Sequence, residues 1–184
     1  VPSMIRQLQD MTGIDPLQVD LTDRTVLSIF NGIEALKIKD PEHYRFKHGT
    51  YAIPEFGTNF TRAMLDDTKP DKFADLVRIS GFSHGTDVWK NNAQDYIRSG
   101  VATMREVIST RDDIMNYLIL KGIENKTSFK IMEDVRKNRP LSDEQVQIMK
   151  DHGVPQWYID SCIKIQYMFP RAHAVAYVMM SFRM

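Results

Sequence analysis

The stretch TRDDIMNYLILKG, residues 110–122, decides how this chain is expected to fold. Thr110 can cap a helix, and Asp113 takes the position that Glu or Gln holds in the usual capping box. Gly122 is placed for the left-handed residue that commonly follows a helix. Between these ends the helix carries Ile114, Tyr117, Leu118 and Lys121. The stretch therefore predicts a helix with both of its ends marked.

Similar signals predict helices along most of the chain. Thr22 or Asp23 can cap a helix that ends near Gly32, and Thr58 can cap one that ends before Pro70. Ser142 with Gln145 forms another capping box, and Pro170 separates the last two helical segments. The other helical patterns are DKFADLVRIS (71–80), SFKIMEDVRK (128–137), PQWYIDSCIKIQYM (155–168) and RAHAVAYVMM (171–180).

Only HGTYAIPEFGT (48–58) resists a helical interpretation, because Gly, Pro and β-forming residues predict a structured loop or a short strand pair. The expected fold class is thus mostly α, a multi-helix domain with a short irregular or β-like segment near 48–58. No repeat or linker divides the chain. We expect one domain over 1–184, with 1–57 as a leading subregion and 58–184 as a helical core. The last residues fall within an apolar run, which favours a piece cut from a longer chain.

Composition excludes several classes of protein. With 24 Lys+Arg, 24 Asp+Glu and a single Cys, Cys162, there is no disulfide framework and no cysteine-rich zinc site, which indicates a reducing, cytoplasmic location. No apolar run reaches the roughly 20 residues that span a bilayer. Residues 161–184 contain Lys164, Arg171 and Arg183 and no acid. Chance and an anion-facing surface explain that run equally well.

Self-contained catalysis is not evident from the motifs. The chain has no HExxH, Walker A loop, GxGxxG or D-x-D pattern. The adjacent pairs Asp66–Asp67 and Asp112–Asp113 lie in helical contexts, where neighbours diverge by about 100°. We interpret them as solvated charges at helix ends, and Cys162 as a buried structural thiol.

Three features instead suggest binding. Arg111 lies in the first turn of the helix capped by Thr110, where free N–H groups favour an anion, although the two acids beside it can satisfy the same dipole. Aromatic and cationic residues alternate around Pro170, which suits stacking on a base or, equally, a core with a solvated arginine. The residues are Tyr167, Phe169, Arg171, His173 and Tyr177. The third feature is SGFSHGTDVW (80–89), which predicts a ligand-facing turn.

Five motifs together resemble a known family. LVRISGFSHGTDVW (76–89), TRDDIMNYLI (110–119), IPEFGT (53–58), MIRQLQDMTGIDP (4–16) and the pattern WYIDSC-KI-YMFP-AHA-AY (157–177) are similar to the bacterial replicative DNA polymerase III alpha subunit. The resemblance is to the fingers domain of its PolC branch, and it covers essentially the whole chain. Met179, Met180 and Ser181, and Arg139 with Pro140, depart from the family's usual residues.

The resemblance implies a mostly helical fingers domain that closes over the incoming deoxynucleoside triphosphate and the templating base. For the full-length protein it implies template-directed nucleotidyl transfer in DNA replication, with Mg²⁺ held by palm aspartates that this chain lacks. We therefore expect no metal bound by this fragment and no polymerase activity from it alone. The implied partners are a DNA primer–template, nucleotides and, through other parts, the sliding clamp and replisome proteins, with no membrane.

The resemblance also assigns roles to residues. Arg111 is expected to bind the triphosphate, and Lys121 to belong to the same substrate site. Arg78, Ser80 and His84 are expected to line the nucleotide side. Tyr167 and Phe169 should pack against the nascent base pair with His173 beside them, and Lys164 and Arg171 should contact DNA. A stand-alone helical DNA-binding module and a protein-interaction domain with aromatic anchors are the alternatives.

Overall fold

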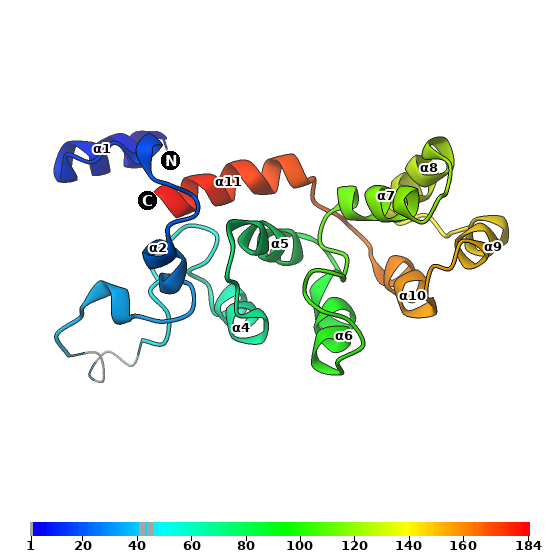
Figure 1. Cartoon of the computed structure of the whole chain (residues 1–184), viewed down its shortest axis with the longest axis horizontal. Coiled ribbons are helices and arrows are strands. Elements are labelled where there is room, and N and C mark those ends of the chain that lie inside the picture. The colour runs from blue at the N-terminus through cyan, green and yellow to red at the C-terminus, as the bar shows by residue number, and fades with distance from the viewer. Residues whose placement is uncertain (1, 41–42, 44–45) are drawn as a thin grey trace. The chain divides into compact units, whose positions relative to one another are not determined.

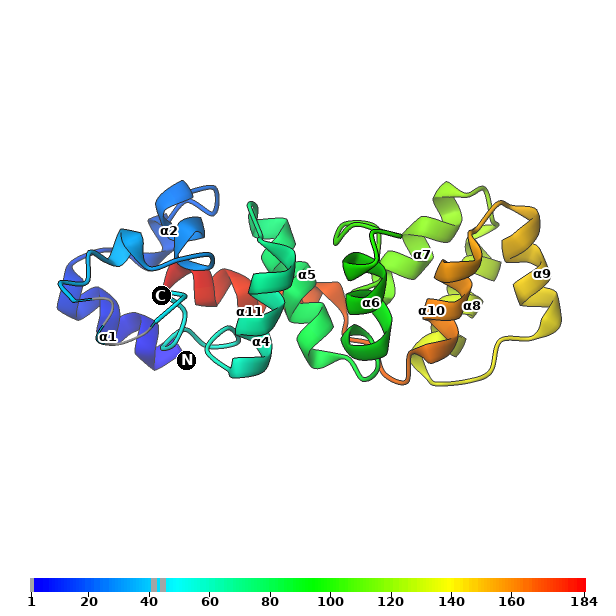
Figure 2. The ribbon, with the colours of Figure 1, turned by 90° about the horizontal axis from the view of Figure 1, so that it is seen from below.

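The structure is a computed structural model that describes residues 2–40, 43 and 46–184, and over these residues the chain is mostly α-helical (Figures 1 and 2). The isolated β-bridge of the described part joins Thr86 to Tyr167. The predicted mostly α fold class is confirmed. The chain divides into two compact units, unit 1 (Val1–Val77 and Val175–Met184) and unit 2 (Arg78–Ala174). The single-domain organisation stays a prediction.

The described part of unit 1 contains three complete helices and parts of two more, with two short 3-10 turns. The elements are α1 (Pro2–Thr12), η1 (Pro16–Gln18), α2 (Arg24–Ile29), η2 (Glu34–Leu36), α4 (Asn59–Thr68), the start of α5 (Phe73–His84) and most of α11 (Arg171–Arg183). The predicted caps are confirmed, because the Asp23 carboxylate accepts the Thr25 N–H at 2.7 Å and the Thr58 hydroxyl accepts the Thr61 N–H at 3.1 Å. The side chains of Asp23 and Thr58 therefore cap the N-termini of α2 and α4.

Aromatic rings form the core of unit 1. Phe30 and Phe56 are fully buried, with ring centroids 5.0 Å apart in an edge-to-face arrangement. Phe182 of α11 stacks on Phe30 at 6.2 Å and meets Phe73 edge-on at 5.9 Å. Each buried aromatic side chain removes 150–250 Å² from water, so these rings supply much of the apolar burial of the unit.

The segment 48–58, predicted as a structured loop or a strand pair, is a compact series of turns. The Thr50 hydroxyl is buried and donates to the Phe56 carbonyl oxygen at 3.0 Å. A Cβ on Gly57 would lie 2.6 Å from the Tyr51 carbonyl oxygen, so only glycine fits at this crossing of the backbone. The loop interpretation is the correct one.

Unit 2 contains a tight turn and five complete helices besides the end of α5 and the start of α11. The elements are η3 (Trp89–Ala93), α6 (Gln94–Arg98), α7 (Arg111–Leu120), α8 (Asn125–Arg136), α9 (Asp143–Asp151) and α10 (Gln156–Lys164). The second predicted capping box is confirmed, since Ser142 and Gln145 exchange bonds of 2.8 and 3.2 Å. Gly122 has a φ of +88°, as predicted for the end of α7.

The segment 80–89 differs from the prediction. Residues 80–84 form the last turn of α5, and only the residues from Gly85 onward leave the helix, so the predicted ligand-facing turn is wrong for its first half. The reason is packing. Ile79 and Phe82 are fully buried, and a Cβ on Gly81 would lie 2.7 Å from the Ser109 carbonyl oxygen. Gly81 therefore serves the close approach of α5 to the start of α7 and does not end the helix.

Candidate functional site

Three segments that are distant in sequence meet in unit 2, and backbone hydrogen bonds hold them together. Thr86, just after α5, donates its N–H to the Tyr167 carbonyl oxygen at 2.9 Å, and its own carbonyl oxygen accepts the Gln166 N–H at 3.1 Å. Arg111, the first residue of α7, donates its N–H to the Phe169 carbonyl oxygen at 3.3 Å. The strand-like segment 165–170 therefore links the end of α5 to the start of α7.

Three predicted site residues form a ring cluster, His84, Phe169 and His173. The His84 and Phe169 rings stack with centroids 4.9 Å apart, and His173 meets Phe169 edge-on at 4.6 Å. The His84 Nδ1 lies 2.8 Å from the Ser80 carbonyl oxygen. The Ser83 hydroxyl lies 2.9 Å from the same nitrogen, so two contacts hold the His84 ring on the last turn of α5. Both histidines are exposed.

Arg111 lies in the first turn of α7 and is half-buried. Among the described residues, its guanidinium has neither a hydrogen bond nor an ion pair. The acid that follows it, Asp112, accepts the Arg171 N–H at 2.8 Å and so caps the start of α11. Arg111 thus adds an uncompensated positive charge to the positive end of a helix dipole, which favours an anion there.

Asp113 is the centre of a buried polar cluster, and its interpretation as a solvated charge is wrong. Its side chain is 8% exposed, and the Oδ2 atom accepts hydrogen bonds from the Ser109 hydroxyl at 2.6 Å and the Ser109 N–H at 3.0 Å. The Thr110 N–H donates to the same atom at 2.9 Å, which completes the predicted capping box. Arg78 binds Oδ2 at 3.0 Å, and Arg171 pairs with Oδ1.

Electrostatics explain why this buried acid stays charged. Burial alone raises the pKa of the Asp113 carboxyl, but the charge of Arg78, the bonds from Ser109 and Thr110, and the charge of Arg171 together hold that pKa below its ordinary value. We call Asp113, Ser109, Thr110, Arg78 and Arg171 the Asp113 cluster. The cluster ties α5, α7 and α11 to one carboxylate.

Two residues predicted to bind substrate or DNA, Arg78 and Arg171, therefore already form ion pairs with Asp113 within the protein. The Arg78 side chain is 18% exposed and also donates to the backbone carbonyl of Arg105. Ser80, predicted to line the nucleotide side, is 1% exposed, and its hydroxyl has no hydrogen-bond partner among the described residues. Ser80 and Arg78 are therefore largely shielded from solvent, whereas the Arg171 side chain is 43% exposed but paired with Asp113.

The remaining predicted site residues lie at different places in unit 2. Lys121 is the C-cap of α7, so the length of that helix, about 15 Å, separates it from Arg111. Its ammonium lies 5.5 Å from the Tyr117 ring centroid. Lys164 donates to the Asn91 carbonyl oxygen at 2.9 Å. Tyr167 is exposed, beside the ring cluster in sequence.

The sequence did not indicate that Asp113 is the centre of a buried polar cluster. The only signal for this residue was the capping box.

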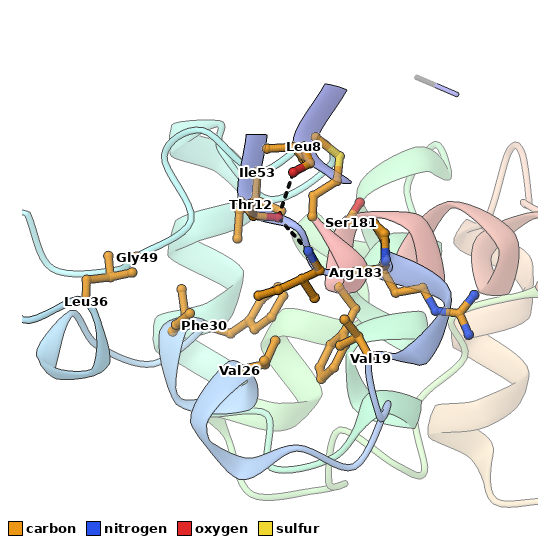
Figure 3. A pocket seen from close by; sticks show the side chains of 15 residues that line it. Leu8, Thr12, Val19, Val26, Phe30, Leu36, Gly49, Ile53, Ser181 and Arg183 are labelled. Atoms are coloured by element: carbon orange, nitrogen blue, oxygen red, sulfur yellow. Dashed lines mark hydrogen bonds between the residues drawn. The ribbon is translucent and has the colours of Figure 1, made fainter. Parts of the chain in front are cut away.

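The sequence also did not indicate a cavity of about 370 Å³ in unit 1 (Figure 3). Phe30, Val26, Leu8 and Ile53 line the cavity with mostly apolar atoms. The Thr12 hydroxyl at its edge donates to the Leu8 carbonyl oxygen at 2.7 Å and is thereby satisfied. Arg183 also lines the cavity, and its buried Nε has no hydrogen-bond partner among the described residues.

Neither a metal centre nor a membrane span is found in the part of the chain that the structure describes. Over residues 2–40, 43 and 46–184, no three or more His, Cys, Asp or Glu side chains gather closely enough to hold a metal ion. Each described helix is too short or too polar to cross a membrane.

Comparison with known proteins places the chain in a family. The sequence profile of the bacterial DNA polymerase III alpha subunit finger domain matches residues 1–154. The chain is 58% identical over 182 residues to the "DNA polymerase III PolC-type" of Caldanaerobacter subterraneus subsp. tengcongensis, and 54% and 53% identical to proteins of that name from Staphylococcus epidermidis and Staphylococcus aureus. Each alignment covers 99% of this chain and 13% of the relative, so the chain spans about an eighth of the relatives' length. The resemblance inferred from the motifs is confirmed, and this chain belongs to the finger domain family of the bacterial DNA polymerase III alpha subunit, PolC type.

Proposed function

We propose that this chain forms the nucleotide-facing part of a replicative, DNA-directed DNA polymerase. In this proposal the full-length protein carries out template-directed nucleotidyl transfer in the cytoplasm, on a DNA primer–template and with other replisome proteins. The present chain binds the incoming deoxynucleoside triphosphate and the nascent base pair. The observation that carries the proposal is the Arg111 guanidinium at the start of α7, which has no partner among the described residues. The Arg111 backbone N–H joins this residue to Phe169 of the ring cluster.

The chemistry of a triphosphate fits the surroundings of Arg111. In nucleotidyl transfer, negative charge grows on the leaving pyrophosphate, and fixed positive groups that meet this charge lower the barrier. Arg111 supplies a planar fork of donors at the positive end of the α7 dipole. Arg78 and Arg171 enter the proposal as supports of that helix, because both already bind Asp113.

The ring cluster fits a base pair. Phe169 and Tyr167 offer aromatic faces, and His84 and His173 extend the ring surface with exposed edges. A surface of this kind favours a base pair of the correct width, because closure of the finger domain is favourable only when the base pair fits against the rings. Ser80 contributes by fixing the His84 ring through its carbonyl oxygen. DNA contact by Lys164 and substrate contact by Lys121 stay predictions, since both lie away from this cluster.

Magnesium enters the proposal only through the rest of the full-length protein. In nucleotidyl transfer the metal would neutralise phosphate charge and activate the primer hydroxyl. In this proposal the palm aspartates of the full-length protein hold the metal. The role of this chain is therefore to bind and orient the nucleotide.

The test is single-turnover incorporation at increasing nucleotide concentration by the full-length polymerase that contains this chain. We expect Arg111→Ala to lower incorporation on the order of a hundredfold or more, because transition-state contacts of this kind contribute about 3–4 kcal/mol. Arg111→Lys should recover only part, since a point charge cannot reproduce the planar fork. Arg98→Ala, which removes an exposed arginine at the end of α6, is the control. Normal incorporation combined with weaker binding of the primer–template would show that Arg111 contacts DNA instead.

A further inference from the structure

Helix α8 presents an exposed aromatic ring between two lysines. Phe129 is 49% exposed, and Lys126 and Lys130 are exposed three residues before it and one residue after it. These spacings place the three side chains on one side of the helix, within an arc of about 100°. The opposite side carries the buried residues Ser128, Ile131, Met132 and Val135. Figure 1 shows α8 beside α7. We call Lys126, Phe129 and Lys130 the α8 face.

The charge around the α8 face is positive and not neutralised. Residues 121–139 contain six basic residues and three acidic ones. Glu133 is occupied by Arg136 and Lys137, each at 2.7 Å, and Asp134 lies 3.8 Å from Arg139. Glu124 is within reach of the Thr127 hydroxyl, at 3.4 Å. Within the described chain, the ammonium groups of Lys126 and Lys130 have no hydrogen bond or ion pair.

The combination selects one class of ligand. A half-exposed ring offers a face on which an unpaired base can stack, while lysines on either side neutralise the phosphates that flank that base. A duplex keeps its bases stacked on one another and could use only the lysines. An apolar protein partner could use the ring, but burying unpaired ammonium groups beside it would be costly. Single-stranded nucleic acid uses both.

We propose that the α8 face binds single-stranded DNA, and that in the polymerase this strand is the unpaired template. The identity of the strand rests on the proposed function, whereas single-strand binding by this face does not. The surface is separate from the candidate nucleotide site, because α8 follows the C-terminal end of α7 and Arg111 lies at the N-terminal end. A template strand on this face would be held before its bases reach the ring cluster.

The experiment measures the affinity of the full-length polymerase for primer–templates by fluorescence anisotropy. The template overhang is either about 2 or about 12 nucleotides, the longer one being within the range that single-strand sites cover. We expect tighter binding of the long overhang by the unaltered enzyme. Phe129→Ala and Phe129→Leu should weaken long-overhang binding by about 5- to 150-fold, and Phe129→Trp should retain it. Binding of the short overhang should not change.

Salt dependence tests the lysines. Each phosphate contact to a single strand contributes a slope of about −0.7 in log affinity against log salt, so Lys126→Ala with Lys130→Ala should reduce the slope by about 1.4 for the long overhang. Controls are Ile163→Ala on α10, which trims another exposed apolar side chain, and Lys150→Ala on α9, which removes another exposed lysine. Unchanged melting temperatures and short-overhang binding establish that the variants are folded.

Several outcomes would overturn the proposal. One is equal affinity of the unaltered enzyme for the long and short overhangs. Another is an equal loss of affinity in the α8 variants and the control variants. A third is a loss of affinity that is the same for both overhangs, which would mean that the α8 face contacts the duplex. Phe129→Leu behaving like the unaltered enzyme would point to an apolar protein partner. A failure of the proposed function gives a different result. Arg111→Ala would then leave nucleotide incorporation unchanged, while the Phe129 variants would still lose affinity for the long overhang.

Discussion

Replacing Asp113 by Asn tests whether the buried carboxylate organises unit 2. The amide has nearly the same shape, and its oxygen can still accept the Ser109 and Thr110 N–H groups, so the main loss is the negative charge opposite Arg78 and Arg171. Removing one partner of a buried ion pair costs about 3–5 kcal/mol. The lower end applies here, because the Arg171 side chain is 43% exposed and can regain solvation. We therefore expect a loss of about 3 kcal/mol.

The two tryptophans make the assay selective. Trp89 and Trp157 are the only ones in the chain, and both belong to unit 2, so their fluorescence in a urea titration reports the unfolding of that unit. Asp112→Asn is the matched control, since it changes the neighbouring acid, which accepts a single N–H at 2.8 Å. That change should cost about 1 kcal/mol. A loss for Asp113→Asn no larger than for Asp112→Asn would refute the reasoning.

The pH dependence follows from the lowered pKa of Asp113. The charged carboxylate stabilises the folded state fully above its unfolded pKa, near 3.8, and that contribution disappears as the pH falls through the lower native pKa. The stability difference between the unaltered chain and Asp113→Asn should therefore be constant at neutral pH and shrink below pH 3.8. A difference that grows in acid would contradict the assigned sign.

Two further predictions concern packing and thiol reactivity. Gly81→Ala should destabilise unit 2 by about 1–3 kcal/mol in the same titration, because the new Cβ would lie 2.7 Å from the backbone carbonyl oxygen of Ser109. Cys162 is 2% exposed, and burial raises the pKa of its thiol, so iodoacetamide should label it only after unfolding in urea. Rapid labelling of the folded chain, measured by mass spectrometry, would show that α10 is open at this position.

Signals that act over a few residues predicted the helix ends well. Asp23, Thr58 and Ser142 cap helices through bonds to N–H groups two or three residues away, so the sequence contains the whole interaction. Gly81 was misleading for the opposite reason. A glycine inside a helix resembles the start of a turn until the neighbouring backbone of Ser109 is known.

The candidate site could be predicted only in part. Arg111 was identified from its place in the first turn of a helix, which is a local property. Asp113 was misjudged because its partners Arg78 and Arg171 lie 35 and 58 residues away in the chain. In the basic run of 161–184, Arg171 likewise pairs with the distant Asp113, and Lys164 binds the distant Asn91 carbonyl oxygen. The clustering of basic residues in the sequence could not reveal either of these two long-range interactions.

The Asp113 cluster has a consequence for how this chain can change in evolution. Arg78 and Arg171 lie near the two ends of the continuous segment that makes up unit 2, and they bind the two oxygens of the same carboxylate. The two ends of unit 2 are therefore joined through the Asp113 side chain. Segments whose ends meet in this way can be inserted or exchanged as blocks without displacing the residues on either side. We accordingly expect residues 78–174 to be the segment that transfers intact between related polymerases. Asp113 would transfer with it and continue to pair with Arg78 and Arg171.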